Sequence, residues 1–107
     1  MPISNINTAS HFSSDKMQKN SLFMSDHLFC DVYCLEPGQE QHVHTHSESD
    51  KIYYVLEGTG TFTLGHNVSA QKSGDIVYAP ANVAHGVANK SRDRLRCLVL
   101  MAPPPNH

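Results

Sequence analysis

Short apolar or alternating segments, separated by turn-forming residues, follow one another along most of the chain. The segments cover residues 28–35, 41–45, 51–57, 61–64, 68–71, 76–79, 83–88 and 95–101. Pro37-Gly38, Gly58 and Gly74 are among the turn signals between them, and no segment keeps the period of an amphipathic helix. Short strands with a turn every roughly eight to twelve residues are typical of antiparallel sandwiches and barrels. The pattern therefore predicts an all-β fold, either an antiparallel sandwich or a small antiparallel β-barrel.

The two ends of the chain differ from this central region, which we interpret as a barrel over residues 28–102. Residues 1–27 are polar and lack sustained periodicity, which predicts a partly ordered N-terminal arm. Residues 1–15 are expected to be loosely ordered or to form an edge strand that needs a partner, and residues 15–20 are expected to form one helical turn. Addition of the arm to the sheet of a neighbouring chain would give a dimer in which the arm is exchanged. Residues 103–107 begin with consecutive prolines, which cannot donate to a sheet, and are expected to form a tail.

Composition narrows the class of protein. The formal net charge is −2 and no basic block is present, which argues against nucleic acid as a partner. No apolar run has the length of a membrane span and the N-terminus has no secretory signal, so we expect a cytoplasmic protein without a membrane partner. Cys30, Cys34 and Cys97 cannot all pair within one chain, and we interpret them as small core residues.

Histidine is the unusual component of this sequence. The chain has eight histidines, and His42, His44 and His46 lie within one short segment. Alternate side chains of a strand share a face, so these rings are expected on one side, either lining a cavity or facing solvent. Tight metal binding needs a third ligand. His85, flanked by small and apolar residues, is the candidate, and a core histidine bonded to backbone is the other interpretation.

Two spaced motifs resemble the two signatures of the cupin superfamily. Gly38, His44, His46 and Gly58 approach the first motif, and Gly74, Pro80, His85 and Asn89 match the second, with Asn82 where glycine is usual. The chain is thereby similar to small single-domain (type-2) cupins. The resemblance implies a double-stranded β-helix, a jelly-roll-like barrel in which His44, His46 and His85 converge on one divalent metal ion. It also implies a homodimer.

One position departs from the cupin pattern. The acidic ligand of the first motif is replaced by Lys51, with Asp50 as its neighbour. Three arrangements are open: Asp50 supplies an oxygen ligand through a local shift, Lys51 points outward and leaves histidines and water, or metal binding is lost and Lys51 holds an organic anion. His42 is a further candidate ligand because it precedes His44 by two residues.

The resemblance also implies a function. Dioxygenases, isomerases and lyases occur among similar proteins, so an ion of Fe, Mn, Ni, Zn or Cu is expected to act on a small oxygenated organic molecule. Lys51, Tyr53, Tyr54 and Phe62 are candidate pocket residues, although aromatic side chains more often pack in cores. The alternative function is a non-catalytic barrel that binds or senses a small ligand, with metal binding weakened by Lys51. The sequence identifies no catalytic residue.

Overall fold

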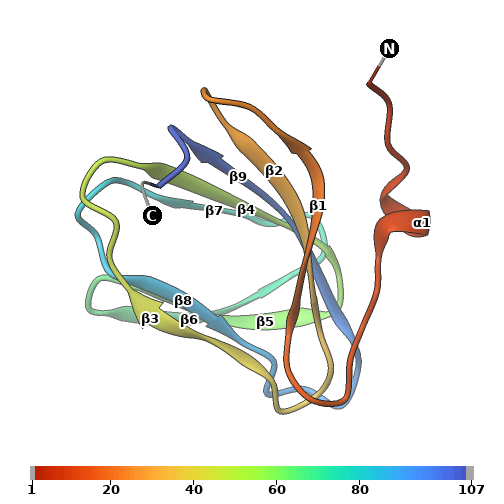
Figure 1. Ribbon diagram of the computed structural model, residues 1–107. Helices are drawn as coiled ribbons and strands as arrows, with labels where there is room; N and C mark the ends of the chain where they lie inside the picture. Colours follow the sequence, from red (N-terminus) through yellow and green to blue (C-terminus); the bar gives the residue numbers. More distant parts are fainter. Residues whose placement is uncertain (1, 106–107) are drawn as a thin grey trace.

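The computed structural model describes residues 2–105, so that residues 106 and 107 of the expected tail lie outside the described part, as does residue 1. Figure 1 shows one short helix and a series of strands. These elements are α1 (Ile6–Ala9), β1 (Gln18–Met24), β2 (Phe29–Leu35), β3 (Glu40–His44), β4 (Asp50–Glu57), β5 (Thr59–Leu64), β6 (Asn67–Lys72), β7 (Ile76–Ala79), β8 (His85–Ala88) and β9 (Leu95–Ala102). In the described part of the chain, no helix is long and apolar enough to cross a membrane.

The strands form two antiparallel sheets that face each other (Figure 1). One sheet has the order β1-β2-β9-β4-β7 and the other has the order β3-β8-β5-β6. Apart from β1 with β2 and β5 with β6, neighbouring strands are distant in sequence, as β2 and β9 are, so the chain passes repeatedly from one sheet to the other. This arrangement is a double-stranded β-helix, and it confirms the all-β prediction.

The core fills the space between the inner faces of the sheets. Alternation along the strands places every second side chain in the core. In β4, Tyr53 and Val55 are fully buried, whereas Ile52 and Tyr54 are each 37% exposed. The buried cluster consists of Tyr33, Leu35, Tyr53, Val55, Phe62, Val87, Leu95, Cys97 and Val99. All the cysteines are free and buried, which confirms their interpretation as core residues.

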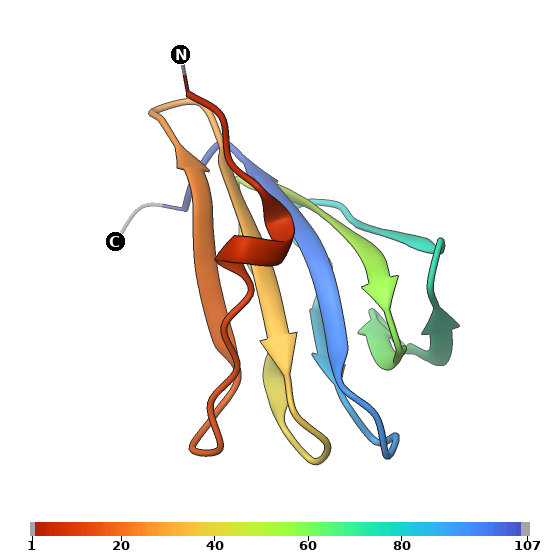
Figure 2. The same ribbon diagram turned by 90° about the vertical axis from the view of Figure 1, so that its right-hand side faces the viewer.

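The N-terminal arm differs from its prediction. The helical turn expected at residues 15–20 is wrong, since residues from Gln18 onward form β1 and the helical turn lies at Ile6–Ala9. Asn5 caps this turn by accepting hydrogen bonds from two backbone amides. Pairing with β2 of the same chain gives residues 18–24 backbone hydrogen bonds that one isolated helical turn could not match. Figure 2 shows α1 across the outer side of this sheet, where Arg96 of β9 donates to Asn7 and Ser10.

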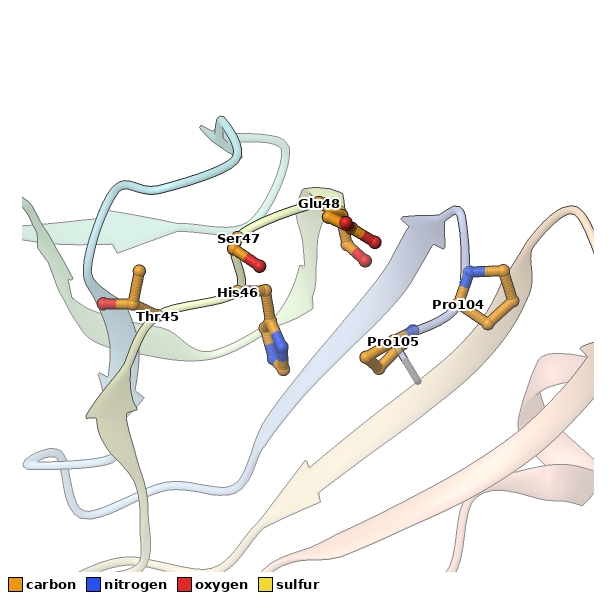
Figure 3. Close-up of a pocket in the computed structure, with 7 residues that line it drawn as sticks. Thr45, His46, Ser47, Glu48, Pro104 and Pro105 are labelled. Carbon is orange, nitrogen blue, oxygen red and sulfur yellow. The ribbon is translucent and has the colours of Figure 1, made fainter. Parts of the chain in front are cut away.

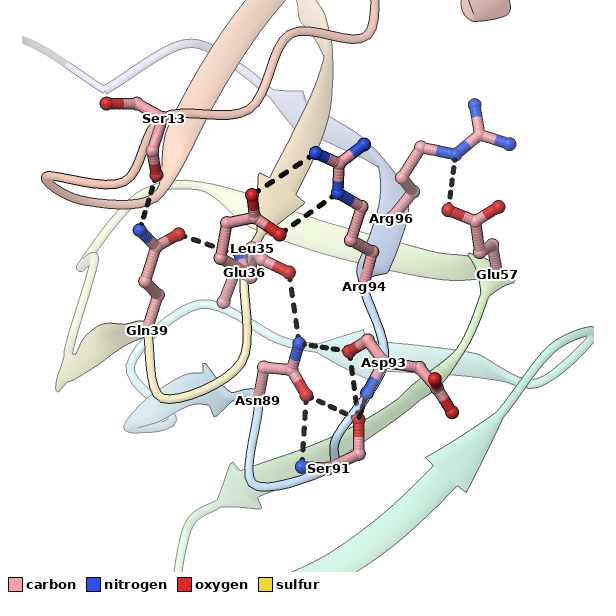
Figure 4. A network of polar contacts seen from close by, with 10 residues as sticks. All are labelled: Ser13, Leu35, Glu36, Gln39, Glu57, Asn89, Ser91, Asp93, Arg94 and Arg96. Carbon is pink, nitrogen blue, oxygen red and sulfur yellow. Dashed lines mark hydrogen bonds and ion pairs between the residues drawn. The ribbon is translucent and has the colours of Figure 1, made fainter.

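Asn89, the last residue of the second motif, organises one end of the barrel (Figure 4). Its side chain is 1% exposed and donates to the carbonyl oxygens of Leu35 and Asp93 at 3.0 and 2.8 Å. It also accepts hydrogen bonds from the amide and hydroxyl of Ser91. Its backbone exchanges hydrogen bonds with the 38–39 turn. Asn89 therefore fixes the turns that join β2 to β3 and β8 to β9, a structural role at the opposite end of β8 from His85.

Candidate metal centre

Three histidines from different segments meet between the sheets. His44 ends β3, His46 lies in the loop that follows, and His85 begins β8 opposite His44. Their available ligand atoms all lie within 4.8 Å of one another. The ring of His44 is 4.7 Å from that of His46 and 4.5 Å from that of His85, centroid to centroid. These distances allow one ion to contact all the rings.

Backbone carbonyl groups orient two of these rings. His44 Nδ1 lies 2.7 Å from the carbonyl oxygen of His42, and His85 Nδ1 lies 2.9 Å from that of Val83. A carbonyl oxygen only accepts, so each Nδ1 carries the proton and each Nε2 keeps its lone pair. His85 Nε2 is buried and has no hydrogen-bond partner among residues 2–105. A buried nitrogen with a free lone pair and no hydrogen-bond donor nearby is suited to bind a metal ion.

A bulge in β3 decides which residues of this strand point inward. The pairing with β8 shifts between Gln41 and His44, so that Gln41 is buried while His42 and Val43 are exposed. The prediction that His42 shares a face with His44 is therefore wrong. The side chain of His42 is 88% exposed, and its Nδ1 lies 3.1 Å from the carboxylate of Glu40. His42 is outside the cluster.

Gly86 of β8 makes the bulge possible. A Cβ atom at this position would lie 2.8 Å from the carbonyl oxygen of Gln41 and 3.0 Å from the amide nitrogen of Val43. Both are backbone atoms of the bulge, which cannot move aside as a side chain can. The close approach of β3 to β8 beside His44 and His85 therefore requires glycine here.

The loop that carries His46 is held by Asn82. The amide of Asn82 donates to the carbonyl oxygen of His46 at 2.8 Å. Asn82 has a positive φ of 71°, a conformation that asparagine tolerates better than most other non-glycine residues. This explains how asparagine can stand where glycine is usual in the second motif, and it links that motif to the histidines of the first.

Asp50 points away from the histidine cluster, whereas Lys51 points into the space between the sheets. Regular alternation along β4 leaves Asp50 exposed and Lys51 buried. The carboxylate of Asp50 accepts a hydrogen bond from the amide of Ala81 at 2.9 Å, and it is not part of the histidine cluster. The arrangement in which Asp50 shifts to supply an oxygen is not found, nor is the one in which Lys51 points outward.

Lys51 is a buried cation beside the histidines. Its side chain is 1% exposed, and its Nζ lies 5.0 Å from the ring centre of Tyr33 and 4.9 Å from that of Tyr53. Burial lowers the pKa of Lys51 to about 7, the charge of Lys19 lowers it further, and Asp31 opposes both. Burial likewise lowers the pKa of His85 to about 4, with a further contribution from Lys51. The imidazole of His85 is therefore neutral near pH 7.

A cavity of about 340 Å³ lies beside the cluster. It is lined by Lys19, Met24, Phe29, Asp31, Tyr33, Gln41, His44, His46, Lys51, Met101 and Pro105. Figure 3 shows a neighbouring cavity of about 380 Å³ at the 45–49 loop, which shares His46 and Pro105 with the first. The first cavity is the candidate ligand site because two of the clustered histidines and Lys51 line it.

The predicted aromatic pocket residues fall in three different places. Tyr53 packs edge-on against Tyr33, Phe62 and His85, and its hydroxyl donates to Gln41 at 2.7 Å. Tyr53 therefore packs behind His85 and Gln41 and holds them in place. Phe62 is buried in the core and borders a different cavity. Tyr54 points to the outer face of its sheet, 37% exposed, because adjacent strand residues face opposite sides. Tyr54 and Phe62 are therefore not lining residues of this site.

Sequence reasoning missed several residues of the cavity wall. Asp31 and Tyr33 come from β2, and Lys19 comes from the unpredicted strand β1. Asp31 is the one charged residue in the otherwise apolar and aromatic segment 29–35, and that contrast in residue type was a usable sequence signal. Nothing in the polar segment around Lys19 distinguishes it from a surface lysine, since only its pairing with Tyr33 brings it to the cavity.

Comparison with known proteins agrees with this geometry. The sequence profile of the cupin domain matches residues 31–101. The chain belongs to the cupin family. This cupin is 36% identical over 70 residues to an uncharacterized protein of Methanocaldococcus jannaschii, which covers 65% of this chain and 56% of that protein. It is 37% identical over 54 residues, 50% of this chain and 26% of the relative, to a 5-nitrosalicylic acid 1,2-dioxygenase of Bradyrhizobium. The chain thus spans little more than half of the first relative.

Solved structures match the cupin over nearly its whole length. The crystal structure of a Thermus thermophilus protein has a TM-score of 0.95 and 38% sequence identity, covering 98% of this chain and 100% of that one. A Klebsiella pneumoniae protein with a double-stranded β-helix domain has a TM-score of 0.89 at 22% identity, covering 96% and 90%. The second likeness concerns the fold alone. The described part of the cupin, including β1, is thus shared with a relative of known structure.

Proposed function

We propose that this cupin binds one divalent metal ion through one ring nitrogen each of His44, His46 and His85, and acts on a small oxygenated organic molecule in the adjacent cavity. The observation that carries the proposal is His85 Nε2, a buried lone pair without a partner in the described part of the chain, within 4.8 Å of the other candidate ligand atoms. Buried polar atoms are rarely left unsatisfied. A metal ion would satisfy this one.

Three imidazoles suit Fe, Ni, Cu or Zn, and the open positions also accommodate Mn. A bound ion would supply Lewis acidity and, for the redox-active metals, reaction with dioxygen. The absence of a carboxylate from the cluster leaves the charge of such an ion available to an anionic oxygen of the substrate. The likeness to a dioxygenase of a hydroxylated aromatic acid supports dioxygenase-like chemistry, with isomerase- and lyase-like chemistry as the other classes.

The residues of this chain prepare the site in three ways. The carbonyl oxygens of His42 and Val83 hold His44 and His85 in the tautomer that presents Nε2. Burial lowers the pKa of both imidazoles, so that protons compete less with a cation for these rings. Tyr53 fixes the wall, since its hydroxyl bonds Gln41 and its ring contacts that of His85.

Metal analysis tests the proposal. Protein purified without chelators is expected to carry about one equivalent of a divalent metal, and His85→Ala is expected to lose it because two rings alone bind weakly. His42→Ala is the matched control: it removes a histidine of the same strand region that lies outside the cluster. Metal contents that are equal in the two variants would contradict the proposal.

A second function is favoured by Lys51. A buried cation at the position of the acidic ligand repels a metal ion, and it faces the cavity, as in a barrel that binds or senses a small ligand without catalysis. Chelator-sensitive oxygen uptake by the iron-loaded protein with catechols supports the enzyme. The other outcome supports the binding module: the protein binds one equivalent of a ligand, and the ligand is recovered chemically unchanged whichever candidate metal is supplied.

A further inference from the structure

The side chain of Lys51 is 1% exposed and lines the cavity, and its amine has no hydrogen-bond or ion-pair partner in the described part of the chain. Two aromatic faces lie about 5 Å from Nζ, those of Tyr33 and Tyr53. An ammonium group has three donors, and cation–π contacts use none of them as a hydrogen bond would. Burying a charge in this way is unfavourable unless something pairs with it. The cavity in front of the amine is the place from which a partner can come.

The cavity carries an excess of positive charge. Lys19 and Lys51 both line it, and both amines lie over the ring of Tyr33, at 5.6 and 5.0 Å. Asp31 is the one carboxylate among its lining residues. Burial raises the pKa of Asp31, and the charges of Lys19 and Lys51 oppose this effect. The formal net charge of the whole chain is −2, so the positive cavity is a local feature.

The two sheets contribute different chemistry to the cavity. Lys19, Asp31 and Lys51 come from β1, β2 and β4 of the five-stranded sheet, whereas His44 comes from β3 of the four-stranded sheet. Apolar side chains also line the wall: Met24, Phe29, Met101 and Pro105. A molecule in this space therefore has lysines on one side, histidines on the other, and apolar contacts along its body.

We propose that the cavity binds a small carboxylic acid with an apolar body, whose carboxylate pairs with the amines of Lys51 and Lys19 while the remainder lies toward His44 and His46. The proposal deepens the proposed function by naming the class of molecule, and it rests on that function only for the part of the ligand that faces the histidines. The lysines hold the carboxylate whether or not a metal ion is present.

Calorimetric titration of chelator-treated, metal-free protein tests this assignment. Benzoate and benzamide serve as probes because they share a shape and differ in charge. We expect benzoate to bind and benzamide not to bind measurably. Lys51→Met should weaken benzoate binding by about ten-fold or more, because a charge-assisted hydrogen bond is lost. Lys19→Met should weaken it by a few-fold, since Lys19 is exposed to solvent.

Lys72→Met is the control, since it removes an exposed lysine of β6 that is not a lining residue of the cavity. It should leave benzoate affinity unchanged. Circular dichroism checks that Lys51→Met is folded. Equal binding of the two probes, or unchanged benzoate affinity in Lys51→Met, overturns the proposal. Inorganic phosphate that binds as tightly as benzoate overturns the assignment to carboxylic acids with an apolar body.

A parallel titration with Zn²⁺ keeps the two proposals separate. If Zn²⁺ binds with one equivalent but benzoate does not bind, the metal centre stands and the carboxylate site is wrong. If benzoate binds to the metal-free protein but Zn²⁺ fails to bind, the carboxylate site stands and the metal centre is wrong. Lys51→Met should bind Zn²⁺ at least as tightly as the unaltered protein, because a nearby positive charge has been removed.

Discussion

Lys51 is a residue that the fold itself does not require. It lies among apolar and aromatic side chains at a position where methionine of similar length would pack without a charge. Its pKa falls from 10.5 to about 7 on folding, and a shift of that size corresponds to a cost of roughly 5 kcal/mol as an upper bound. Residues that oppose stability in this way are typical of functional sites, which supports a role in ligand binding.

Lys51→Met is expected to stabilise the metal-free protein. Below pH 7 the amine is protonated in both states, so the full cost of burying the charge is present. Between pH 7 and 10.5 the unfolded chain holds a proton that the folded chain does not, and stability rises with pH. The gain from the substitution is therefore largest at low pH. We expect roughly 1–4 kcal/mol at pH 6 and about half of that at pH 9.

Urea denaturation of both proteins at the two pH values measures this gain. Other titrating groups contribute equally to the free energy of unfolding of both proteins, so their contributions cancel when the two free energies are subtracted. Lys72→Met, at an exposed site of β6, should change stability little at either pH. A gain for Lys51→Met that is the same at pH 6 and pH 9 would show that the buried amine is not the cause.

At the scale of elements, the bulge of β3 determines the composition of the metal cluster. It turns Gln41 inward to meet Tyr53 and leaves His42 in solvent. Gly86→Ala should disturb it, because the added Cβ would meet backbone atoms of Gln41 and Val43 at 2.8 and 3.0 Å. We expect a loss of roughly 1–3 kcal/mol in stability and, since His44 and His85 flank this contact, a loss of Zn²⁺ affinity.

Val87→Ala is the control for the effect of lost stability alone. Val87 belongs to the core, so its truncation should cost roughly 1–3 kcal/mol without moving β3. Stability is measured by thermal denaturation and affinity by titration with Zn²⁺. A Gly86→Ala protein that binds Zn²⁺ as tightly as Val87→Ala would mean that the bulge can relax without displacing His44.

The elements also show which parts of the structure could be predicted. Short apolar or alternating segments bounded by turn residues located the barrel strands to within one or two residues, as at 51–57, observed as Asp50–Glu57. Strand β1 was missed because its sequence is mostly polar and only its pairing with β2 makes it a strand. The sequence pattern did not show that His42 lies outside the histidine cluster, because the bulge that turns it outward depends on Gly86, which is distant in sequence. Local patterns do not contain such contacts.

At the scale of the molecule, the outer face of the five-stranded sheet has a part covered by the N-terminal arm and a part with exposed apolar side chains. The N-terminal arm lies over one part (Figure 2), where Arg96 anchors it. Strands β4 and β7 carry exposed apolar residues in cross-strand pairs, Ile52 with Tyr78 and Tyr54 with Ile76. Ile76 is 66% exposed and Tyr78 is 51% exposed. Clustered apolar surface of this kind marks interaction sites more often than scattered residues do.

We expect this face to be the interface of a homodimer, because an uncharged apolar patch is complementary to a second copy of itself about a two-fold axis. Sedimentation at micromolar concentration should give twice the mass of one chain. Ile76→Lys should shift the protein to monomers, since it buries an unpaired charge in the contact. Val68→Lys places the same charge at an exposed valine of another sheet and should not. A single-chain mass for the unaltered protein, or dimers that persist equally in both variants, would place the interface elsewhere or remove it.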